Sequence, residues 1–160
     1  MSDPIEILVR RLNAVLTGES TTQGLHFFCQ LGGYDDDLGI ITMQVAGSGK
    51  TLISWRTDPE EVELWTYQFT DEDYRQFLRL FLKFPFWSAS PARRGRRDDE
   101  TNIHLRISAQ DIGTHQGLQF WSDDMVEFPV LKKVMEPLTR LIHHLTLEQI
   151  PRDELDAIFP

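Results

Sequence analysis

The chain has 160 residues, of which 41% are hydrophobic, so a single domain of this length can bury a core without disulfides or bound metal. Its net charge of −9 disfavours nucleic acid as a partner, because an acidic surface repels the phosphate backbone. The single cysteine, Cys29, excludes an internal disulfide framework, and no segment has the roughly 20 apolar residues that a membrane span needs.

The first predicted element is an N-terminal helix. Asp3 can cap it, Pro4 suits its first position, and Gly18 can end it. No basic region followed by a long apolar run precedes it, so we expect no secretory signal and place the protein in the cytoplasm.

Four strands are predicted next, because the apolar period changes to two after Gly24. They cover residues 25–31, 38–46, 51–56 and 61–69, and their short connections favour antiparallel hairpins. The turn Gly47–Lys50 resembles part of a phosphate-binding loop. That loop also needs an earlier glycine, where this chain has Gln44, and a helix after it, so we predict a hairpin turn.

A middle helix is predicted from Thr70 to Phe84, with a capping box at its start and Pro85 as its stop. A mobile charged loop is expected over 88–101. Strands over 102–109 and 117–122 then lead to a long C-terminal helix over 128–145 and a tail over 147–160. Pro137 should kink or split that last helix.

Grouped strands with flanking helices predict one α+β domain over 1–160. We expect an antiparallel sheet of about six strands, with the N-terminal, middle and long C-terminal helices on one face.

Two polar loops are the candidate partner-binding segments. The first contains three successive aspartates, whose spacing lacks the later glutamate of a calcium loop. The second contains four arginines, partly neutralised by the acids that follow them. The residues proposed for partner binding are Tyr34, Asp35, Asp36, Asp37, Arg93, Arg94, Arg96 and Arg97.

No catalytic, cofactor-binding or metal site is predicted. Cys29 and His26 lie three apart on one strand, so their side chains leave opposite faces. His104 and His115 flank a predicted strand pair and could meet across it, but two histidines without a third ligand make a weak metal site.

The pattern from Gly32-Gly33 onward resembles the emfourin-like small bacterial domains. The matching pieces are the helix at 70–84, Asp98-Asp99, the strand Ile103–Ile107, His115 and the start of the last helix at Pro129. The resemblance covers about two thirds of the chain. It implies peptidase inhibition through loops that enter a metallopeptidase cleft.

The size, acidity and helix–strands–helix–strands–helix order are also similar to the type III secretion chaperones, which implies a homodimer. From these patterns we expect a non-enzymatic protein-binding or regulatory module, and the first resemblance implies a peptidase-inhibitor-like domain. The alternatives are a secretion-chaperone-like homodimer and a small enzyme with no recognisable motif. We expect no nucleic-acid, membrane or cofactor partner.

Overall fold

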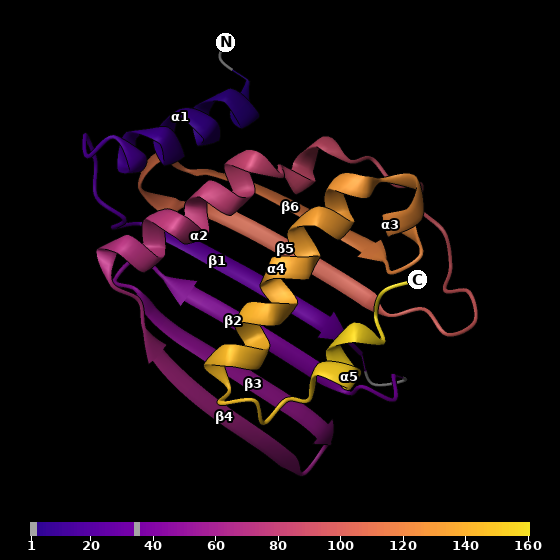
Figure 1. Cartoon of the computed structure of the whole chain (residues 1–160). Coiled ribbons are helices and arrows are strands. Elements are labelled where there is room, and N and C mark those ends of the chain that lie inside the picture. The colour runs from indigo at the N-terminus through magenta and orange to yellow at the C-terminus, as the bar shows by residue number, and fades with distance from the viewer. Residues whose placement is uncertain (1–2, 34–35) are drawn as a thin grey trace.

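Across residues 3–33 and 36–160, which the computed structural model describes, six strands form one antiparallel sheet (Figure 1). The strands lie in the order β4-β3-β2-β1-β5-β6. Their bounds are β1 (Leu25–Gly32), β2 (Ile40–Ala46), β3 (Lys50–Asp58), β4 (Glu61–Gln68), β5 (Asn102–Ala109) and β6 (Thr114–Trp121). The helices are α1 (Pro4–Leu16), α2 (Asp71–Lys83), α3 (Asp124–Glu127), α4 (Pro129–Leu145) and α5 (Arg152–Asp156). The predicted α+β class is confirmed.

The two helix starts predicted from the sequence are capped as expected. The Asp3 carboxylate accepts a hydrogen bond from the Ile5 amide at 2.9 Å. At α2, the Thr70 hydroxyl accepts from the Asp73 amide, and the Asp73 carboxylate accepts from the Thr70 amide, both at 3.1 Å. These bonds satisfy amides that the first helical turn leaves unpaired.

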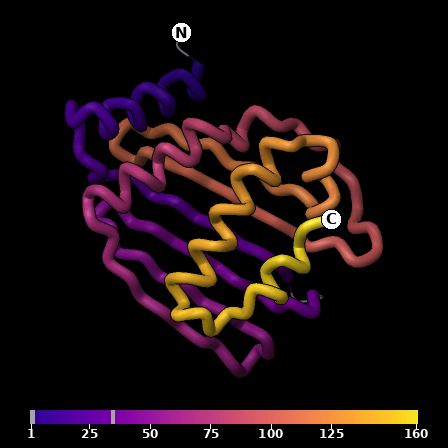
Figure 2. The backbone as a smooth tube through the Cα atoms, in the orientation of Figure 1, coloured from indigo at the N-terminus to yellow at the C-terminus, as the bar shows by residue number. Residues whose placement is uncertain are grey.

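One face of the sheet carries the core. Figures 1 and 2 show α2 and α4 crossing this face, with α1 beside α2. The ring of Phe27 lies 4.9 Å from that of Phe77 and 4.8 Å from that of Phe81, measured between centroids. The aromatic stripe of α2 therefore packs the helix layer against the sheet, and burial of its rings contributes hydrophobic stabilisation.

The opposite face of the sheet is not covered by a helix of the described chain. Because side chains alternate along each strand, every strand contributes residues to it. The central part is mixed, with His26, Phe28 and Gln30 of β1 half-buried among their neighbours. This open face becomes more apolar and more exposed toward β4.

Two elements differ from the sequence prediction. β6 begins at Thr114, three residues early, because a short 3₁₀ turn and left-handed Gly113 (φ 64°) close the hairpin tightly. The short helix α3 was not predicted. At Pro137, where a kink or a split was expected, α4 continues without splitting.

The C-terminal tail packs against the rest of the molecule. Its apolar residues Ile150, Leu155 and Ile158 are buried, and α5 contacts α4. None of the helices within residues 3–33 and 36–160 combines the length and apolar character needed to cross a lipid bilayer.

Candidate partner-binding site

The β1–β2 connection holds the first predicted segment. Tyr34 and Asp35 lie outside the described residues. The Asp36 amide donates to the Gly33 carbonyl at 3.1 Å, and the Gly39 amide donates to the Asp36 carbonyl at 2.9 Å. The Trp55 indole of β3 donates to the Leu38 carbonyl at 2.8 Å, which ties this end of the loop to the sheet.

Glycine at position 32 is dictated by the geometry of this loop. Gly32 has φ 85°, a left-handed conformation that side chains disfavour, and a Cβ there would overlap the Gly39 carbonyl. The loop can therefore return toward β2 only with glycine at this point. The glycine at position 32 is thus explained by the backbone geometry of the loop, without reference to a binding role.

The second predicted segment is organised around a buried carboxylate. Arg94 donates through Nη1 and Nη2 to the two oxygens of Glu100, at 2.7 and 2.6 Å. Arg94 Nη2 also donates to Asp124 at 3.1 Å, and the Arg97 amide donates to Glu100 at 2.6 Å. Glu100 has no exposed surface. This network fixes the arginine loop to the start of β5 and to α3.

The same hydrogen bonds set the protonation of Glu100. The bonds from Arg94, aided by the Arg97 amide, hold its pKa at about 2 and outweigh the opposing effect of burial. In return the pKa of Arg94 is raised by its bond to Glu100. The pair is fully ionised at neutral pH, and Arg94 has no free terminal nitrogen for a partner.

Arg96 joins the two predicted segments. Its Nη2 lies 3.6 Å from Oδ1 of Asp36, and its Nε donates to the Glu100 carbonyl at 2.8 Å. Burial raises the pKa of Asp36, while Arg96 opposes that rise. Loops that are about 60 residues apart in the sequence therefore form one surface at one end of the sheet.

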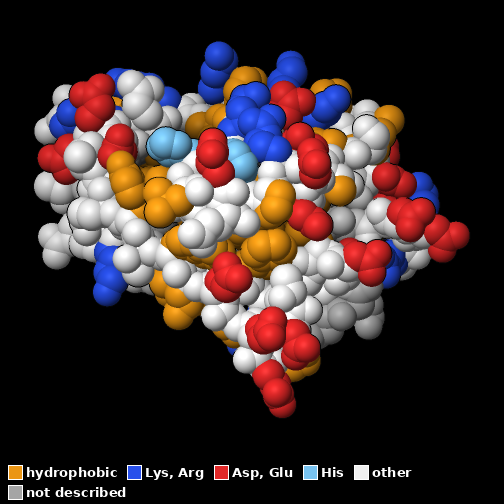
Figure 3. Space-filling view, turned by 60° about the horizontal axis from the view of Figure 1, so that its bottom comes forward, with side chains coloured by type: hydrophobic (Ala, Val, Ile, Leu, Met, Phe, Trp, Pro, Cys, Tyr) orange, Lys and Arg blue, Asp and Glu red, His pale blue; other side chains and the backbone are white. Residues whose placement is uncertain are grey.

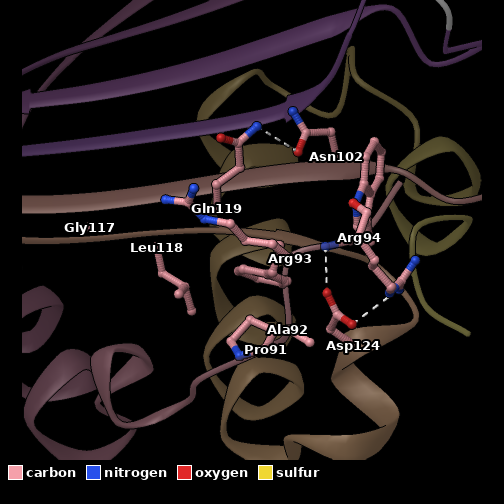
Figure 4. Close-up of a pocket in the computed structure, with 11 residues that line it drawn as sticks. Pro91, Ala92, Arg93, Arg94, Asn102, Gly117, Leu118, Gln119 and Asp124 are labelled. Atoms are coloured by element: carbon pink, nitrogen blue, oxygen red, sulfur yellow. Dashed lines mark hydrogen bonds and ion pairs between the residues drawn. The ribbon is translucent and has the colours of Figure 1, made fainter. Parts of the chain in front are cut away.

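The other two arginines remain exposed. Arg93 lines a hollow of about 520 Å³ between the loop 91–94 and strand β6, whose apolar wall includes Leu118 and Trp121 (Figure 4). Arg97 is engaged through its backbone, and its side chain faces solvent. Of the four predicted arginines, Arg93 and Arg97 are thus the ones whose side chains form no ion pair within the described residues.

The remaining reactive side chains do not converge. Phe28 lies edge-on to His104 at 5.5 Å, whereas His115 pairs with Ser108, four residues along β5 from His104. At about 3.3 Å per residue these histidines lie roughly 13 Å apart, so the prediction that they could meet was wrong. Among the described residues, no three His, Cys, Asp or Glu side chains could share a metal ion. Cys29 is buried, which raises its pKa to about 12.

Two features were missed from the sequence. One is an apolar patch on the open face beside the sheet edge, formed by Leu52, Val62 and Leu64, which are 37%, 40% and 63% exposed. The other is a set of helix cations between α2 and α4. The strand period could have indicated the first, because the apolar residues of β4 fall on both faces.

Comparison with known proteins adds no relative to this picture. The resemblance to emfourin-like domains and to secretion chaperones rests on the sequence pattern alone. No protein-family model matches the chain, and no curated protein sequence matches it.

Proposed function

We propose that this chain is a non-enzymatic protein-binding domain that receives an extended segment of its partner along strand β4. The observation that carries the proposal is the apolar patch of Leu52, Val62 and Leu64 at the edge of the open face. In the β3–β4 pair Leu52 is opposite Thr66 and diagonal to Leu64, so all three apolar residues lie on the open face, with Ser54 opposite Leu64 and Arg56 opposite Val62. Exposed apolar patches at a sheet edge commonly mark interaction sites.

The backbone of β4 supports the same use. β4 is the last strand of the sheet, it is eight residues long, and within the described residues no strand pairs with its outer side. Its unpaired amides and carbonyls can hydrogen-bond an added strand, which supplies affinity, while alternate side chains supply specificity.

The side chains of β4 indicate the chemistry of the segment. Val62 and Leu64 point to the open face, whereas Glu61 and Glu63 are exposed toward the helix face. An added strand therefore presents apolar residues to one face and is best matched by lysine or arginine on the other. The acidic net charge of the whole chain favours the same basic partner.

A homodimer is the second candidate, in line with the chaperone-like order of elements. A second copy can add its own β4 antiparallel about a two-fold axis, with Leu64 opposite Leu64. In that register Val62 faces Thr66 and Glu63 faces Trp65. The glutamates of the two copies are thereby kept from directly opposite positions.

The test uses two fluorescent nine-residue peptides, one alternating valine with lysine and one alternating valine with glutamate. Fluorescence anisotropy should show that the valine–lysine peptide binds the intact chain more tightly. The variant L64K should weaken that binding about tenfold, because it removes an apolar contact and adds a repelling charge. Hydrogen exchange of the β4 amides should slow in the complex.

The matched control is V126K, which places the same change at an apolar residue that is 71% exposed on α3, beside the opposite edge of the sheet. Equal binding of both peptides, or equal loss in L64K and V126K, would refute strand addition at β4. Light scattering separates the second candidate: a dimer that L64K converts to a monomer supports self-pairing, and a monomeric wild type rejects it.

A further inference from the structure

We infer that the groove between α2 and α4 is a second docking surface, which binds an acidic amphipathic helix of a partner protein. This groove lies on the helix-covered side of the sheet, so it is separate from the β4 patch. The inference does not rest on the proposed use of β4.

The groove has a basic end. Arg79 and Lys83 of α2 face Lys133 and Arg140 of α4 across a hollow of about 520 Å³. All four side chains are exposed, and within the described residues none forms an ion pair. The one carboxylate at this end, Glu136, pairs with Lys132 at 4.0 Å.

This concentration of positive charge is unusual in a chain of net charge −9. Figure 3 shows lysine and arginine side chains gathered along the upper edge of one face, beside hydrophobic side chains and a few acidic ones, with further acidic side chains at the sides and the lower end. Four cations and one carboxylate, Glu136, line this end, so it keeps a net positive charge that a bound acidic group neutralises. The chemistry therefore selects an anionic ligand at this end.

The groove continues into an apolar end. A second hollow of about 380 Å³ shares Gln76, Leu80 and Pro137 with the first. Its apolar lining includes Leu141 from α4, and its polar lining includes His144 and Asp73, whose carboxylate accepts hydrogen bonds from the Thr70 amide and the Tyr67 hydroxyl. A ligand that fills both hollows needs an apolar side as well as acidic groups, which a free phosphate does not offer, and the net charge of −9 disfavours nucleic acid.

An amphipathic helix meets both needs. Its apolar residues recur every three or four positions and fit a groove between two helices, and acidic residues at one end reach the four cations. Pro137 favours this use, because it has no amide to donate to the Lys133 carbonyl and so leaves an acceptor at the groove. We therefore assign the occupant as a protein segment with an apolar stripe and an acidic end.

The probe is an 18-residue fluorescent peptide of leucine and glutamate with leucines at helical spacing, measured by anisotropy. A leucine–lysine peptide of the same pattern and a scrambled leucine–glutamate peptide are the comparison ligands. We expect the patterned leucine–glutamate peptide to bind best. The variants R79E and R140E should each weaken it about tenfold, and R10E, which reverses an exposed arginine on α1, should not.

The alternatives are separated by competition. Displacement of the peptide by inorganic phosphate, a thymidine oligonucleotide or phosphatidylserine vesicles at similar concentration would show a general polyanion site and overturn the assignment. Equal binding of the scrambled peptide would do the same. Unchanged binding in both R79E and R140E would remove the groove from consideration. Retention of leucine–glutamate binding in L64K, with its loss in R79E, would support two separate surfaces.

Discussion

Arg94 places its two terminal nitrogens on the two carboxylate oxygens of Glu100, at 2.7 and 2.6 Å, and Glu100 is wholly buried. Paired bonds of this kind are the strongest charge-assisted hydrogen bonds in proteins. The charged loop is thus built around an internal ion pair. Its outward charges are Arg93 and Arg97, together with the acids that follow them.

Replacing Glu100 should destabilise the fold. In E100Q the guanidinium of Arg94 loses its bidentate carboxylate and keeps only Asp124 at 3.1 Å, and the Arg97 amide loses a charged acceptor, which is destabilising. We expect urea unfolding to show a clear loss of stability. D98N, which changes an exposed acid of the same loop, should change stability by less than about 0.5 kcal/mol. Equal effects of the two changes would contradict the network.

The Glu100 pair should also make stability depend on pH in the acid range. Its pKa is about 2 in the folded chain, against an ordinary value of 4.5. The unfolded chain therefore binds a proton first as pH falls, and the stabilisation, complete above about pH 4.5, is lost toward pH 2. Urea unfolding at several pH values between about 6 and 2.5 should show this fall. In E100Q the fall should be smaller, and an identical slope in both proteins would reject the assignment.

Cys29 should report global unfolding. Its side chain is 1% exposed, and burial raises its pKa to about 12, so the reactive thiolate is scarce in the folded chain. Labelling with a disulfide reagent at neutral pH should be slow, and it should accelerate in proportion to the unfolded fraction as urea is added. Rapid labelling without urea would show that the central strand opens locally.

The helix at Thr70 shows what a sequence can predict. Its cap, apolar stripe and proline stop are all local, so the pattern predicted α2 and its buried face correctly. The role of Glu100 could not be predicted in that way. A carboxylate after two aspartates and four arginines has the pattern of a solvated loop, and its burial depends on α3 and β5, which only the tertiary fold places beside it.

The β4 patch and the cations of the α2–α4 groove could not be predicted for the same reason, because both depend on how the elements pack together. Leu64 is exposed because it points to the face of the sheet that α2 and α4 do not cover, and because β4 is the edge strand. The four cations of the groove come from helices about 50 residues apart in the sequence. Each cation has an ordinary exposed position on its own helix, and the four line one hollow only because α2 and α4 lie on either side of it.

The Asp36–Arg96 contact tests the peptidase-inhibitor resemblance. The pair is 3.6 Å apart and partly exposed, so R96A should cost less than about 1 kcal/mol of stability. If the two joined loops enter a peptidase cleft, R96A should weaken inhibition of a zinc metallopeptidase such as thermolysin, because the loops lose their shared geometry. R10E on α1 should leave inhibition unchanged. No inhibition by the wild-type chain at micromolar concentration would reject this function for that peptidase class, while the peptide-binding tests of β4 would stand on their own.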